Sequence, residues 1–227
     1  MNESLVALIA ASIAFVGTHF ALSHPLRAPL VRLLGATGFM ALYSVVALAC
    51  LYWMNVAFRD AAPASLGGSG MIGWIAASAL TLVAMVLLFG SFRANPALPA
   101  PGAQDIAASR EPTGVFAVTR HPMMWSFALW AISHIVLWWS WRTNVVALAI
   151  LVLALVGAHL QDRKKDVLMG EAWKAWEART SYWPRWSKLA SAGWLLWLVA
   201  IATWLAFTWA HLHLAGIPAG AWRWIEV

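Results

Sequence analysis

Apolar runs separated by short polar segments dominate the pattern of this chain. Six of the runs have roughly the 17–25 residues that a helix needs to cross a hydrocarbon core of about 30 Å. They cover residues 4–22, 36–58, 70–90, 123–140, 143–160 and 189–212. Because irregular backbone cannot face lipid, each run is predicted to be a helix. The pattern therefore predicts an all-α polytopic membrane protein, with a six-helix transmembrane bundle in a single domain over residues 1–227.

The composition agrees with this pattern and excludes some classes of protein. Hydrophobic residues make up 62% of the chain, charged residues only 11%, and the mean hydropathy is +0.72. The net charge of +6 is attributed to basic residues in the segments between the apolar runs, as in membrane proteins, and no nucleic-acid partner is expected. The opening "MNESL" has no positive segment, so a cleaved signal peptide is not predicted. Cys50 is the single cysteine, which excludes an intrachain disulfide and a cysteine-based metal site.

The positive charges are distributed unevenly between the two predicted sides of the membrane. Of the 15 lysines and arginines, all but Arg59, Arg142 and Arg223 fall in the segments that follow the first, third and fifth predicted helices. Loops rich in lysine and arginine stay in the cytoplasm, so both termini are predicted to lie outside it.

Two of the predicted cytoplasmic segments differ in character. The segment 94–119, which opens with "ANPALPAPG", is expected to be an irregular linker. The segment 161–188 mixes tryptophan with alternating charge, which predicts an amphipathic helix in the headgroup region. Its tryptophans are Trp173, Trp176, Trp183 and Trp186.

Three of the histidines that fall inside predicted helices are candidate metal ligands. His134 lies about 18 Å into the membrane when counted from Pro122 at about 1.5 Å per residue. An ionisable side chain at that depth needs a partner and indicates a function. His19 lies one turn from the end of the first helix, and His159 lies at the end of the fifth.

His121 differs in kind, because Pro122 disfavours helical geometry at the residue before it and is predicted to begin the helix. Arg120 and His121 then flank a helix N-terminus, where free N–H groups favour an anion such as a carboxylate, phosphate or propionate. His121 and His134 do not share a face of a continuous helix, so the two are expected to have different roles.

Buried imidazoles in an apolar bundle suit haem b, whose iron takes one or two histidines and whose propionates need cations. The predicted ligands are His19 together with His134 or His159. His19 and His159 lie at similar depths, whereas His134 is about 13 Å farther in, and the sequence leaves the choice open. The predicted cofactor-binding side chains on this side of the membrane are Arg27, Arg32, Arg120, His121 and Arg163.

The stretches "FVGTHFALSHPLRAPLVRLLG", "TRHPMMWSFALWAISHIVLWW" and "GAHLQDRKKD" resemble the NnrU family over most of the chain. That family also resembles the membrane-bound, haem-b-containing 15-cis-zeta-carotene isomerases. The resemblance implies a bacterial inner-membrane protein linked to denitrification or nitric oxide metabolism, and in that membrane the charge distribution predicts periplasmic termini. It also implies a redox-gated isomerase acting on a lipophilic, polyene-like molecule. The isomerases carry a cysteine near the position of His134. This chain has Ala131 three residues before His134 and no cysteine nearby, so a thiolate ligand is not expected.

The elements "TRHP" and "GEAWKAWEARTSYWPRW" are also similar to isoprenylcysteine and phospholipid methyltransferases. That similarity implies an alternative function, in which Arg120, His121 and residues 161–182 hold S-adenosylmethionine. The paired glutamates typical of those enzymes are replaced here by "QDRKKD", with Asp162 and Asp166. A third interpretation is a non-enzymatic factor that assists the assembly of a respiratory complex.

Overall fold

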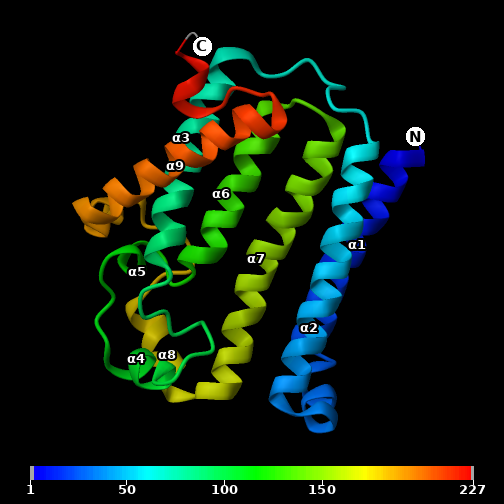
Figure 1. Ribbon diagram of the computed structural model, residues 1–227. Helices are drawn as coiled ribbons and strands as arrows, with labels where there is room; N and C mark the ends of the chain where they lie inside the picture. The colour runs from blue at the N-terminus through cyan, green and yellow to red at the C-terminus, as the bar shows by residue number, and fades with distance from the viewer. Residues whose placement is uncertain (1–2, 226–227) are drawn as a thin grey trace.

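The computed structural model describes residues 3–225, which are mostly helical and contain no strand (Figure 1). The principal helices are α1 (Glu3–Ser23), α2 (Arg27–Asp60), α3 (Gly70–Gly90), α6 (Pro122–Leu137), α7 (Trp141–Met169) and α9 (Trp194–Ala215). Shorter elements are α4 (Ala103–Ser109), α5 (Val115–Val118), α8 (Glu171–Arg179), and the 3₁₀ helices η1 (Trp186–Ala192) and η2 (Gly220–Arg223). This confirms the prediction of an all-α, polytopic membrane protein. Five of the described helices are long and apolar enough to span a membrane, and α6, with 16 residues, is the shorter apolar helix.

Helix α7 separates two packing regions of the bundle (Figure 1). On one side it packs on α1, and a small core of Leu8, Ala11, Phe15 and Met54 joins α1 to α2. On the other side it packs on α6, which packs in turn on α3, and α9 covers α3. The larger core lies on this second side and includes residues from α3, α5, α6, α8 and α9.

Helix α6 ends earlier than the predicted run because Trp138 adopts a left-handed conformation, with φ of 50°. The carbonyls of the three residues 137–139 accept hydrogen bonds from the backbone N–H groups of Ser69, Gly68 and Leu66. The segment before α3 therefore satisfies the backbone that α6 leaves free at its end. Ser140 then caps α7 by accepting a hydrogen bond from the N–H of Thr143.

Helix α2 is interrupted at Gly35, whose φ of 71° and ψ of 171° are not helical. Glycine takes this conformation at little cost because it has no Cβ. The part after Gly35 matches the predicted membrane run 36–58, and the part before it is a short helix that the hydropathy pattern did not predict.

The tryptophan-rich segment 161–188 differs from the single amphipathic helix that the sequence predicted. Its first nine residues continue α7, and α8 then turns back to pack on α4. Trp173 and Trp176 are completely buried instead of lying among headgroups, because α4 and Phe116 cover them. The linker 94–119 is likewise less irregular than expected, since it forms α4 and α5.

The start of α1 and the short helix η2, the first and last described elements, lie at the same end of the bundle (Figure 1). Arg59, Arg142 and Arg223 lie at this end: Arg142 bonds the carbonyls of Phe58 and Ala61, and Arg223 stacks on Trp74 at the start of α3. The other lysines and arginines belong to the opposite end, which we call the cation-rich end. The structure therefore separates the lysines and arginines between the two ends of the bundle in the way that the predicted topology assumes.

Candidate functional site

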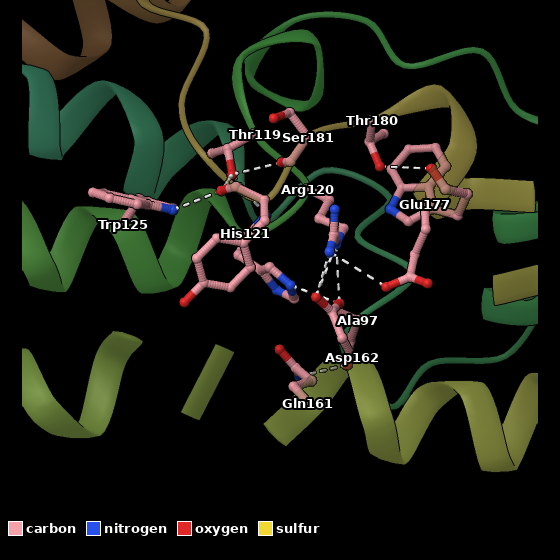
Figure 2. Close-up of polar contacts among 12 residues, drawn as sticks. Ala97, Thr119, Arg120, His121, Trp125, Gln161, Asp162, Glu177, Thr180 and Ser181 are labelled. Carbon is pink, nitrogen blue, oxygen red and sulfur yellow. Dashed lines mark hydrogen bonds and ion pairs between the residues drawn. The ribbon is translucent and has the colours of Figure 1, made fainter. Parts of the chain in front are cut away.

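The cation-rich end contains a buried cluster of charged side chains centred on Asp162 (Figure 2). The Nε of Arg120 lies 3.0 Å from both carboxylate oxygens of Asp162, and its Nη2 donates to Oδ2 at 2.6 Å. The Nε2 of His121 donates to Oδ1 at 2.7 Å. The His121 side chain is fully buried, and those of Arg120 and Asp162 are 13% and 10% exposed. Removing charges from water to this extent is tolerated because each has a hydrogen-bonded partner.

The backbone around Pro122 sets the position of Arg120 and His121. As predicted, His121 is the cap residue and α6 begins at the proline. Thr119 is extended and buried, and its hydroxyl donates to the carbonyls of Ser181 and Tyr182. Asp162 approaches from the continuation of α7, so the cluster joins α6 to α7 and to the segment that follows α8 (Figure 2).

Glu177 and Tyr182 complete the rim of the cluster. Glu177 lies 3.3 Å from Arg120, and the Arg120 guanidinium lies 5.7 Å from the centre of the Tyr182 ring. Partial burial and the nearby charge of Asp162 raise the pKa of Glu177, and the same two causes raise the pKa of the Tyr182 hydroxyl. The Asp162 carboxylate is therefore the principal partner of Arg120, and Glu177 is a weaker second one.

The cluster leaves some buried polar atoms unpaired within the described residues. The Nδ1 of His121 has no hydrogen-bond partner, and the indole N–H groups of Trp173 and Trp176 have none either. The rings of His121 and Trp173 are 6.5 Å apart. Since Nε2 donates its proton to Asp162, Nδ1 of a neutral imidazole carries a lone pair and is an unused acceptor, as is the buried Oδ1 of Asp166 at the same end.

A groove of about 570 Å³ opens at the same end, between α7 and the connection from α1 to α2. Its walls are largely apolar, and include Phe20, Leu160 and Val167. Its basic side chains are His24, Arg27, Arg163 and Lys164. None of the four forms an ion pair with a carboxylate in the described part of the chain. The groove therefore combines apolar walls with positive charges that nothing in residues 3–225 neutralises.

Two of the predicted metal ligands lie beside this groove. His19 is one helical turn before Ser23, and His159 is one turn before Arg163; both Ser23 and Arg163 line the groove. The Nδ1 of His19 donates to the carbonyl of Phe15 at 2.7 Å, since a carbonyl only accepts. Its Nε2 then carries the lone pair that a metal binds. His159 is exposed and has no side-chain hydrogen bond within the described residues.

The third predicted metal ligand, His134, lies elsewhere. It is near the end of α6 that faces the termini, whereas His19 is near the opposite end of α1 (Figure 1). Its Nδ1 donates to the carbonyl of Trp130 at 2.8 Å and also contacts the hydroxyl of Ser133. The structure thus places His19 and His159 at one level of the bundle and His134 at another.

The predicted cofactor-binding residues divide into three groups. Arg27 and Arg163 line the groove, and Arg120 and His121 belong to the Asp162 cluster. Arg32 is exposed and does not line the groove. No group of three or more His, Cys, Asp or Glu side chains within residues 3–225 is arranged to hold a metal ion.

Sequence reasoning did not identify Asp162 as the centre of a cluster or connect Glu177 to it. The available signal was Asp162 itself, an acidic residue directly before the cations Arg163, Lys164 and Lys165 and next to an apolar helix. A carboxylate at the edge of a membrane span needs a partner. Only the fold shows that this partner is 42 residues away, on Arg120.

The fold and the site define a polytopic, all-α membrane protein with a buried Arg–His–Asp cluster at its cation-rich end. The chain matches the family described as NnrU protein over residues 7–219, and it therefore belongs to the NnrU family. Neither the curated proteins nor the solved structures contain a significant match.

Proposed function

We propose that the protein binds haem b in the groove between α1, α2 and α7. The observation that carries this proposal is that two kinds of group meet at one site, namely imidazoles that can bind a metal and cations that can pair with carboxylates. His19 offers a free Nε2, and His159 is one helical turn before Arg163. Arg27 and Lys164, which form no ion pair within residues 3–225, lie nearer the membrane surface. An amphiphilic macrocycle with a central metal and two carboxylates fits this order of groups.

In this proposal His19 and His159 would hold the iron, and Arg27, Arg163 and Lys164 would neutralise the propionates. The Phe15 carbonyl fixes the tautomer and orientation of the His19 ring. Phe15 and Tyr43 pack against that ring, with centroids 4.3 and 5.5 Å away, and hold it in place. The volume of about 570 Å³ lies within the range of small-molecule and cofactor sites. Bound haem would supply a redox-active iron that also acts as a Lewis acid.

The resemblance noted from the sequence extends the proposal to an activity. It implies redox-gated isomerisation of a polyene-like lipid, or a role in denitrification and nitric oxide metabolism. The groove opens between membrane helices and has mostly apolar walls, so a lipophilic molecule is able to reach it from the bilayer. The S-adenosylmethionine alternative gains less support, because Arg120 and His121 are already paired with Asp162.

The test is an absorption spectrum of the detergent-purified protein after haem reconstitution, oxidised and reduced. We expect a Soret band in the wild type, and its loss or displacement in both His19→Ala and His159→Ala. His213→Ala is the matched control, since His213 is exposed near the other end of the bundle. A wild type that takes up no haem would refute the proposal, as would an unchanged band in His19→Ala. If only His134→Ala loses the band, the groove is not the haem site.

A further inference from the structure

A second basic pocket lies at the cation-rich end, between α5 and η1. It has a volume of about 510 Å³. Arg179, Arg185 and Lys188 supply its positive charges, and Thr113, Gly114 and Ser191 supply polar wall atoms. None of these residues belongs to the Asp162 cluster or to the groove beside His19.

Hydrogen bonds hold the two walls of this pocket together at both ends. The N–H of Arg185 donates to the carbonyl of Val118 at 2.8 Å, and the hydroxyl of Ser191 donates to the carbonyl of Gly114 at 2.9 Å. Arg179 is fixed separately, since its Nη2 donates to the carbonyls of Ala107 and Ala108 at 2.6 and 3.0 Å. The pocket is therefore built into the fold and does not depend on the chance meeting of mobile side chains.

The charge of the pocket is not neutralised within the described part of the chain. Arg185 and Lys188 form no ion pair there. Arg179 has one acidic neighbour, Glu111, at 4.0 Å, and the side chain of Glu111 is 81% exposed. Three cations that face one cavity repel one another, so an anion that enters it is stabilised by all three.

Exposed indole rings place this pocket at the level of the lipid headgroups. Trp183, Trp186 and Trp194 lie next to it along the chain, and they are 66%, 47% and 75% exposed. Tryptophan exposed next to a membrane helix is typical of the interface between hydrocarbon and water. Trp194 is also the first residue of α9, so the pocket lies directly beside the point where this helix begins.

We propose that this pocket binds the headgroup of an anionic phospholipid, with Arg185 and Lys188 on its phosphate. Charge complementarity favours an anion, and the exposed indoles beside the pocket favour one that is anchored in the bilayer over one that is free in solution. A lipid at this position would rest its acyl chains against α9, whose surface carries the exposed side chains of Leu195 and Leu198.

Native mass spectrometry of the purified protein with added phosphatidylglycerol tests this site. Each cation contributes about 1 kcal/mol to binding at an anionic membrane surface. We therefore expect Lys188→Gln and Arg185→Gln each to weaken lipid binding roughly fivefold, and the double variant more. Both side chains are exposed, so the variants should fold. Arg59→Gln, which removes one exposed cation at the other end of the bundle, is the matched control.

Three results would overturn the proposal. The first is equal weakening in Arg59→Gln, which would indicate an effect of net charge. The second is equal binding of the zwitterionic phosphatidylcholine, and the third is displacement of the lipid by millimolar inorganic phosphate, which would assign the pocket to a soluble anion. The haem spectrum of each variant separates this site from the groove, because loss of lipid binding should leave the Soret band unchanged.

Discussion

Asp162 is the one acidic side chain that Arg120 and His121 share, and its loss would leave both without their main partner. Asp162→Asn would remove the negative charge and retain the size, leaving a guanidinium that is 13% exposed against only the half-buried Glu177. Breaking a buried pair in this way costs about 3–5 kcal/mol. We expect a large fall in the melting temperature of the detergent-solubilised protein, measured by intrinsic tryptophan fluorescence.

The matched control for this substitution is Asp60→Asn. Asp60 is exposed at the end of α2 and forms no ion pair within residues 3–225. Its substitution should change the melting temperature little. Equal shifts in the two variants would show that the Asp162 cluster does not stabilise the fold.

At the scale of single helices, Gly35 joins the short first part of α2 to its membrane-spanning part. A Cβ at this position meets no atom within 4 Å, so any effect of Gly35→Ala comes from the backbone conformation alone. An alanine with φ near 71° and ψ near 171° lies in a region that only glycine adopts readily, which strains it by about 1–3 kcal/mol. The first part of α2 is expected to move in order to relieve the strain. This part contains Arg27, which lines the groove, so the movement would displace Arg27 from it.

We therefore expect Gly35→Ala to lower both the melting temperature and the haem content of the purified protein. Gly17→Ala is the control, since Gly17 lies within α1 and also has open space around it. Alanine in a regular helix stabilises it by about 1 kcal/mol relative to glycine, so this variant should melt at the same or a higher temperature. A fully stable Gly35→Ala protein would show that the interruption of α2 is not required.

The elements were predictable from sequence to the extent that one physical requirement determined each of them. Hydropathy predicted α3 with its observed bounds, and Pro122 predicted the start of α6. The burial of Trp173 and Trp176 was not predictable, because tryptophan suits both a headgroup layer and a core, and only the return of α8 onto α4 decides between them. The groove next to His19 and His159 was anticipated in part, through the similar depth of the two residues, but its walls come from helices that are distant in sequence.

At the scale of the whole molecule, the position of the termini depends on whether α6 crosses the membrane. With 16 residues, α6 is about 24 Å long, less than the hydrocarbon core of about 30 Å. It nevertheless runs from the cation-rich end to the opposite end, packed between α3 and α7 (Figure 1). Neighbouring protein shields its ends, and Ser69 and Gly68 bond the backbone beyond it. We therefore expect α6 to be a sixth crossing.

Six crossings would put both termini on one side, and the excess of cations at the other end then predicts that the termini lie outside the cytoplasm. Alkaline phosphatase fused at either terminus in a bacterial inner membrane should therefore be active, and green fluorescent protein fused there should not fluoresce. Fusions within the loop 98–102, before α4, should show the reverse. If α6 did not cross, the segments before and after it would lie on the same side, and the two termini would give opposite results. Because each terminus reports independently, one pair of fusions distinguishes five crossings from six and measures on which side of the membrane both proposed sites lie.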